Sequence, residues 1–310
     1  MVNAYIMMLF VVVFYAGNIL TGRAINELPP FTIAFFRLVV AFLVMLPFGL
    51  RSAWAYRDKF REYKKPFLLM TLTGITFFNT FIYGALQFTT STNVSVLETV
   101  IPVATVGLSA FLLKERLRNS QIVGVLLSLF GAVWVVLDGR IFSIAGMNWN
   151  IGDSIMIGAV GSWAVYSILV KQYMSLFPQF GALFVMSGIS IIVLLPIVAV
   201  EWLVAGVPSL LIEPANVAGI AYLGLFPSFI ALIFYNRAVG VLGASQASVF
   251  LNFLPIVTMV GAWLWLDEAI TMMKVAGALA VITGVMLTTG NSGKRQKHLY
   301  GKQHQEKAID

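Results

Sequence analysis

The sequence predicts an all-α membrane protein with ten transmembrane helices in two inverted five-helix repeats. Three observations support this prediction: a very apolar composition, recurrent apolar windows of membrane-spanning length, and an internal repeat. The 310 residues are 59% hydrophobic and 11% charged, with a mean hydropathy of +0.90. One water-soluble core cannot bury that much apolar surface, so the chain is expected to lie in a lipid bilayer.

Ten apolar windows are long enough to cross a hydrocarbon core about 30 Å thick. They are too continuously apolar for barrel strands, and lipid offers no partners to open backbone groups, so helices are expected. The first window lacks a basic leader and a cleavage pattern, so it is expected to remain as a helix. The expected spans are residues 4–22, 31–50, 66–88, 92–113, 120–138, 152–172, 180–202, 215–238, 244–266 and 272–290.

Segments 111–137 and 264–290 resemble each other without a gap at a shift of 153 residues. The shift pairs Ser95 with Ser248, Pro102 with Pro255, Glu115 with Glu268, Gly124 with Gly277 and Gly131 with Gly284. A weaker match at a shift of 148 joins the front halves and pairs Pro30 with Pro178. The chain is therefore expected to comprise a first repeat (1–145), a second repeat (146–291) and a polar basic tail (292–310).

Because each repeat has five spans, the second copy must enter the membrane from the opposite side. The even-numbered loops and the tail carry sixteen Lys and Arg residues, the other side carries three, and Arg37 falls within a span. The positive-inside rule then predicts a multi-pass inner-membrane protein with both termini in the cytoplasm. The basic cluster at 51–65 is explained by this orientation and by contact with lipid, so no nucleic-acid partner is expected.

Several features resemble one transporter superfamily in their order along the chain. These are the Asn18–Arg37 stretch with its Pro29-Pro30 pair and the glutamate-bearing segment "LLKERL" that precedes Gly124 and Gly131. Together they resemble the drug/metabolite transporter superfamily, and within it the EamA-type carriers, over about residues 4–290. The chain is most similar to bacterial amino-acid exporters, but the superfamily also includes nucleotide-sugar, triose-phosphate and drug carriers. The second repeat departs from the first, because Val185 stands opposite Arg37 and Asp267 opposite Lys114.

The residue inventory excludes several classes of function. The chain has no cysteine, and its two histidines, His298 and His304, lie in the tail, so no metal site or cofactor is expected. The spans lack a clustered nucleophile, base or acid, and no Walker A sequence occurs, so an enzyme and direct ATP coupling are disfavoured. A receptor or scaffold remains the alternative from another class. Inverted repeats instead favour a secondary transporter with a midplane site.

Glu98 is the sharpest candidate within the membrane. It lies six residues inside its span, and its repeat equivalent is Leu251, so the carboxylate breaks the symmetry. Such a residue is costly in hydrocarbon. It can be a proton-coupling or substrate-amine site, one half of a structural ion pair with Arg37, or a water-exposed group at the outer mouth. A functional role is favoured for Glu98 and a structural one for Arg37.

Amide and aromatic side chains supply the other candidate substrate-binding residues. Amides can donate and accept hydrogen bonds, which suits a zwitterionic or polyhydroxy solute, but they also join helices. Aromatic faces can hold an apolar group or an ammonium, or can simply pack. The candidates are Asn18, Asn79, Tyr83, Trp163, Tyr166 and Asn252.

Two structural signals complete the sequence-based expectations. Pro102 and Pro255 lack an amide hydrogen, so helix breaks are expected near both. The glycine pairs of spans five and ten allow close helix approach, either within the chain or in a dimer, so a monomer and a homodimer both remain open. The overall hypothesis is a carrier that exports a small metabolite, an amino acid, by alternating access, driven either by protons or by facilitated diffusion.

Overall fold

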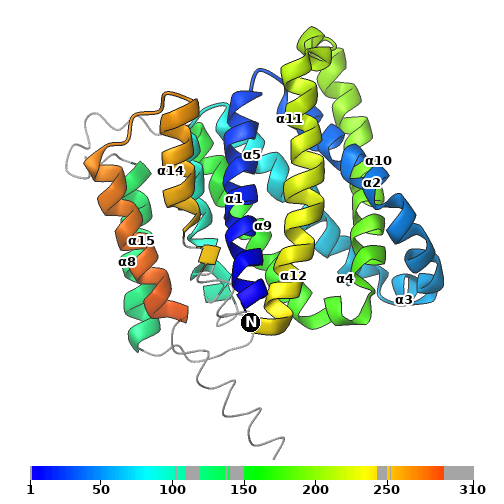
Figure 1. Ribbon diagram of the computed structural model, residues 1–310, viewed down its shortest axis with the longest axis horizontal. Coiled ribbons are helices and arrows are strands. Elements are labelled where there is room, and N and C mark those ends of the chain that lie inside the picture. Colours follow the sequence, from blue (N-terminus) through cyan, green and yellow to red (C-terminus); the bar gives the residue numbers. More distant parts are fainter. Residues whose placement is uncertain are drawn as a thin grey trace, which may run out of the picture.

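A computed structural model describes residues 2–101, 103–105, 107–108, 119–136, 139, 150–242, 250–251 and 253–289. Within these residues every regular element is a helix, which confirms the predicted all-α class. The helices form one layered bundle (Figure 1).

The first half of the chain follows the predicted spans closely. Its third span is one continuous rod of three elements with a π-helical centre, and a short helix, α3, joins the second span to it. The elements are α1 (Val2–Ala24), α2 (Pro30–Ala55), α3 (Arg57–Glu62), α4 (Lys64–Met70), η1 (Thr71–Phe77), α5 (Phe78–Leu86), α6 (Ser91–Glu98) and α8 (Asn119–Val136).

The second half has a similar order, again with a π-helical segment in its third span. Its elements are α9 (Ile151–Tyr173), η3 (Met174–Leu176), α10 (Gln179–Ala205), η4 (Ser209–Ile212), α11 (Pro214–Leu225), η5 (Phe226–Ile230), α12 (Ala231–Leu242), α14 (Leu254–Trp265) and α15 (Met272–Thr289). A shift of 153 residues moves η1 onto residues 224–230, so the two π-helical segments occupy matching positions.

The fourth span, expected over residues 92–113 with a helix break near Pro102, is interrupted in the structure. The α-helix ends at Glu98, and a turn occupies Thr99 and Val100 before helical structure resumes at Ile101. Pro102 cannot donate the amide hydrogen that would bond to the Glu98 carbonyl, which favours a break there. Phe253 is likewise a turn residue, two positions before Pro255 in the ninth span.

The two halves pack against each other in a symmetrical way, so a contact between two helices has a counterpart between the equivalent helices of the opposite halves. The second helices of the halves, α2 and α10, pack against each other, as do the fifth helices, α8 and α15. Contacts of α1 with α12 and α14 have counterparts in those of α9 with α5 and α6. Figure 1 shows α8 and α15 side by side at one edge of the bundle and α2 with α10 at the other.

Glycines bring α8 and α15 into backbone contact. A Cβ on Gly284 would lie 2.5 Å from the amide nitrogen of Ser128 and 2.6 Å from the carbonyl oxygen of Gly124. A Cβ on Gly131 would lie 2.8 Å from the carbonyl oxygen of Gly277. Of the two alternatives for these glycines, the structure supports a crossing within the chain.

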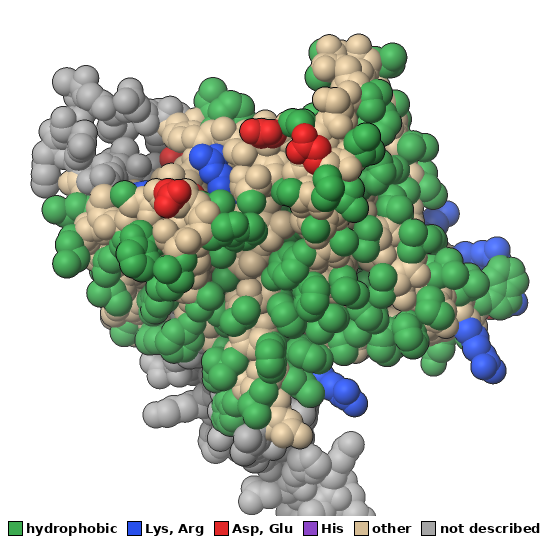
Figure 2. Space-filling view, turned by 45° about the horizontal axis from the view of Figure 1, so that its top comes forward, with side chains coloured by type: hydrophobic (Ala, Val, Ile, Leu, Met, Phe, Trp, Pro, Cys, Tyr) green, Lys and Arg blue, Asp and Glu red, His purple; other side chains and the backbone are tan. Residues whose placement is uncertain are grey.

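Six helices of the described chain are long and apolar enough to span a membrane, and three shorter apolar helices accompany them. Large apolar side chains such as Leu43, Ile192 and Trp263 are exposed, which suits a lipid-facing surface. Figure 2 shows this apolar face, with Asp and Glu side chains along the upper edge and most Lys and Arg side chains towards the lower right. The core beneath includes Ile33, Ile82 and Leu86.

Candidate functional site

The guanidinium of Arg37 is the centre of a buried polar network at the middle of the bundle. Arg37 is only 4% exposed and extends from the second turn of α2, which begins at the Pro29-Pro30 pair. Its Nη1 donates to Asn18 Oδ1 at 3.2 Å, to Asn79 Oδ1 at 2.5 Å and to the Tyr83 hydroxyl. Its Nε and Nη2 both donate to Ser228 Oγ, at 3.1 and 2.5 Å. The network therefore joins the first three spans to η5 of the second half.

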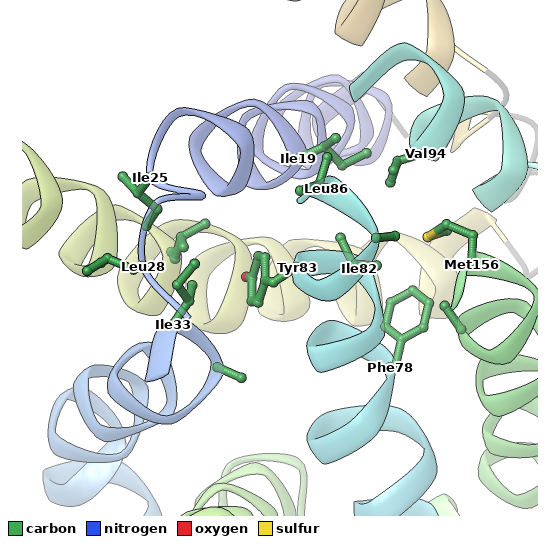
Figure 3. Packing of buried hydrophobic residues seen from close by; sticks show 14 of the residues in the cluster. Ile19, Ile25, Leu28, Ile33, Phe78, Ile82, Tyr83, Leu86, Val94 and Met156 are labelled. Atoms are coloured by element: carbon green, nitrogen blue, oxygen red, sulfur yellow. The ribbon is translucent and has the colours of Figure 1, made fainter. Parts of the chain in front are cut away.

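Hydrogen bonds among the partners fix the orientation of the network. Tyr83 is fully buried, and its hydroxyl donates to Asn18 Oδ1 at 2.9 Å. The Cζ of Arg37 lies 5.5 Å from the centre of the Tyr83 ring, a cation–π distance. In Figure 3, Tyr83 and Phe78 leave α5 on different sides, with Phe78 towards Met156 of α9. The third span thus separates a polar side from an aromatic side.

The π-helical geometry of η5 positions Ser228. Its hydroxyl donates to the carbonyl of Leu223, five residues earlier, at 2.6 Å. The Thr76 hydroxyl of η1 makes the same five-residue contact with the Thr71 carbonyl, at 3.2 Å. Because the Ser228 proton is used in this bond, its oxygen is left to accept from Arg37. Wide turns of this type occur frequently at functional sites.

The ion pair expected between Arg37 and Glu98 is not formed. Within the described chain, no carboxylate oxygen lies within 4.0 Å of Arg37, and the only ion pairs there are exposed contacts among Arg57, Asp58, Lys59, Arg61 and Glu62. The guanidinium of Arg37 instead donates its hydrogen bonds to neutral acceptors. Of the three alternatives left open for Glu98, the ion pair with Arg37 is therefore the one that the structure does not contain.

Glu98 lies at the carboxyl end of α6, directly before the turn at Thr99 and Val100. Its side chain is half-buried and has no hydrogen-bond partner among the residues that the structure describes. The carboxylate therefore makes no described hydrogen bond with the Arg37 network and lies next to a broken helix.

The aromatic candidates form a cluster on the other side of the third span. The ring of Trp163 lies 4.3 Å from that of Phe78 and 4.9 Å from that of Tyr166, between ring centres. Gly74 of η1 leaves room for Tyr166, because a Cβ there would lie 2.3 Å from the ring. Trp163 is half-buried, whereas Tyr166 is 7% exposed and packed. Trp163 is thus the more accessible of the two rings.

Two predicted residues, Asn252 and Pro102, lie outside the described residues. Pro255 is described and lies at the start of α14. Asn18, Asn79 and Tyr83 are brought together, and the role of all the candidates in binding stays a prediction. Ser228 was missed by sequence reasoning because one serine in an apolar helix is common; the only signal was the adjacent Pro227.

A second polar contact lies at the end of the bundle away from the amino terminus. The carboxylate of Glu268, in the linker between α14 and α15, accepts from the backbone amide and hydroxyl of Ser91 at 2.9 and 2.6 Å. It also accepts from the amide and hydroxyl of Thr92 at 3.3 and 3.1 Å. These four bonds, here named the Glu268 clasp, hold the start of α6 against the second half.

Comparison with known proteins gives the class to which this fold and site belong. The model of the EamA-like transporter family matches residues 2–137 and 150–290. The chain therefore belongs to this family of membrane transporters, which confirms the resemblance to the drug/metabolite transporter superfamily.

Individual relatives agree with this class over nearly their full lengths. The uncharacterized transporter YyaM of Bacillus subtilis is 25% identical over 290 residues, covering 93% of this chain and 94% of the relative. An uncharacterized transporter of Archaeoglobus fulgidus is also 25% identical, covering 93% and 97%. A solved crystal structure aligns with a TM-score of 0.62 at 18% identity, covering 92% of this chain and 96% of its own, which supports the fold alone.

Proposed function

We propose that this transporter carries amino acids across the cytoplasmic membrane, outward, by alternating access between two inverted five-helix repeats. The observation that supports it most is the presence of two charged side chains within the bundle: the buried guanidinium of Arg37, whose described partners are all neutral, and the carboxylate of Glu98, which has no hydrogen-bond partner among the described residues. An amino-acid zwitterion carries a carboxylate that complements Arg37 and an ammonium that complements Glu98. Apolar side chains of the substrate would pack on the Trp163 and Phe78 rings.

Alternating access is supported by the reciprocal packing of the halves. Exchange of the two halves maps most of the helix contacts onto one another, so two similar arrangements of the bundle are available. The broken fourth and ninth spans provide hinges near the midplane. The Glu268 clasp closes one end, and the orientation predicted from charge makes that the outer end, with both termini cytoplasmic.

Glu98 is the proposed contact for the substrate ammonium and the candidate for proton coupling. A carboxylate without a described partner, at a helix break, can accept an ammonium or a proton at little structural cost. These two roles differ in one respect: only the coupling role makes transport respond to a pH gradient.

The test is uptake into proteoliposomes that contain the purified chain alone. A panel of labelled amino acids, with and without an imposed pH gradient, is compared between wild type and Glu98→Gln. Saturable uptake that unlabelled substrate inhibits is expected, and the variant should lose uptake or its gradient response. The conservative variant Glu201→Gln changes a half-buried carboxylate that accepts from the start of α2, and it serves as the control for loss of a partly buried charge. No uptake of any amino acid by a folded sample would contradict the proposal.

A further inference from the structure

Arg37 carries a positive charge that nothing in the described chain neutralises. Its partners Asn18, Asn79, Tyr83 and Ser228 are all neutral. A buried charge in a membrane protein is costly, and it normally pairs with an opposite charge or marks a substrate path. Neutral hydrogen bonds satisfy the guanidinium geometry without cancelling its charge. The centre of the bundle is therefore complementary to one anionic group.

One edge of the guanidinium is held firmly by protein. Nη1 carries two hydrogens and has three acceptors, from Asn18, Asn79 and Tyr83. These acceptors come from α1 and α5, so the plane of the guanidinium is fixed from two helices. Such preorganisation reduces the entropy lost on binding.

The opposite edge of the guanidinium, formed by Nε and Nη2, has only one described acceptor. Nε and Nη2 form the fork that binds a carboxylate through two parallel hydrogen bonds. Here a single oxygen, Ser228 Oγ, accepts from both atoms. Nη2 carries a second hydrogen, for which the described residues supply no acceptor. One neutral hydroxyl therefore occupies an edge whose two nitrogens can each donate to one oxygen of a carboxylate.

We infer that Arg37 is the specificity-determining residue for the carboxylate of the substrate, which replaces Ser228 on the Nε–Nη2 edge. This inference rests on the proposed amino-acid transport and assigns one end of the substrate. The site selects solutes with a free carboxylate over their amides, and it binds one substrate per chain, because Val185 stands at the matching position of the second half.

The test is competition between an amino acid and its own carboxamide. Proteoliposomes take up the best-transported labelled amino acid of the panel, and the unlabelled acid or carboxamide is added as competitor. In wild type the carboxamide is expected to compete about 10- to 100-fold more weakly, because its NH2 group cannot accept from the guanidinium and it lacks the opposite charge. In Arg37→Gln the acid weakens by a similar factor while the carboxamide is unchanged, so the discrimination disappears.

Arg23→Gln is the matched control, because Arg23 donates to the Leu86 carbonyl outside the network. It should keep the wild-type discrimination. Arg37→Gln with unchanged discrimination would overturn the inference, whereas absence of amino-acid uptake by wild type would overturn the proposed function itself.

A folding defect in Arg37→Gln would not prevent a decision. Thermal stabilisation of the detergent-solubilised wild-type protein is then measured with the acid and with the carboxamide. A rise in Tm with the acid alone supports the inference, and equal rises with both contradict it. Ser228→Ala leaves the guanidinium in place and removes its neutral occupant, so discrimination should be retained.

Discussion

Two contacts between the halves of the chain are built in opposite ways. At the edge of the bundle, the backbones of α8 and α15 approach closely at glycines, and the side chains of Val135 and Val281 pack against the crossing. At the centre, α2 meets η5 through the hydrogen bonds of Arg37 with Ser228. A glycine crossing cannot separate without losing its packing, whereas polar partners can be exchanged for those of a solute. The first contact thus suits a fixed scaffold and the second a site whose contacts change during transport.

The glycine crossing should be the more sensitive of the two to substitution. Gly284→Ala places a methyl group 2.5 Å from a backbone nitrogen, so the helices must move apart. We expect destabilisation of about 3 kcal/mol or more, measured as a large loss of Tm and of monodisperse protein. Gly161→Ala is the matched control, because a Cβ there meets nothing within 4 Å. Equal stability of the two variants would show that the crossing is loose.

The central network should affect transport more than stability. Tyr83→Phe removes the hydroxyl that donates to Asn18 and accepts from Arg37. We expect uptake to fall about ten-fold, with a loss of stability of only about 1 kcal/mol. Tyr222→Phe removes a hydroxyl that makes only a 3.5 Å contact with the Phe14 carbonyl, so it should transport normally. Normal uptake by Tyr83→Phe would remove the network from the transport path.

The Glu268 clasp provides an intermediate case at the end of the bundle. Glu268→Gln weakens charge-assisted bonds to Ser91 and Thr92, so a loss of about 1–2 kcal/mol and a fall of a few degrees in Tm are expected. Asp267→Asn is the control, because Asp267 has a φ of 53°, which asparagine also adopts readily. The chain has no cysteine, so a cysteine introduced at Thr90 reports solvent access at this end without background labelling. Labelling should rise in Glu268→Gln; unchanged labelling would mean that the clasp does not hold this end closed.

The smallest effect is expected at the surface, outside both contacts. Lys59 and Glu62 form an exposed ion pair at 3.0 Å in α3, where the hydrogen bond from Lys59 lowers the pKa of Glu62. Exposed pairs of this kind contribute little. Lys59→Gln should therefore leave Tm and uptake unchanged, and a clear loss of uptake would assign this loop a role that neither contact explains.

The helices were predictable from sequence because apolar windows of membrane-spanning length have few alternative structures. The expected span 4–22 became Val2–Ala24, and 180–202 became Gln179–Ala205. The break after Glu98 was less predictable, since prolines kink some helices and interrupt others. Pro102 marked its neighbourhood without fixing the turn at Thr99 and Val100.

Most residues of the site could be identified from the sequence, because polar groups are costly within a membrane, but their arrangement in space could not. Asn18, Asn79 and Tyr83 stood out because polar groups in a span need partners. That they surround Arg37 depends on how α1, α2 and α5 pack, which no local pattern encodes. Ser228 depends on the register of a π-helical turn in the other half, and a single serine gives no sign of that register.

The most direct measurement is exchange across the proteoliposome membrane. Vesicles containing the purified chain are preloaded with unlabelled amino acid, and the initial uptake of the same labelled amino acid is compared with that of empty vesicles. Alternating access predicts faster uptake into preloaded vesicles, because each return of the loaded carrier re-exposes the site to the labelled solution. Uptake that is independent of preloading and rises linearly with concentration would instead indicate a channel and contradict alternating access.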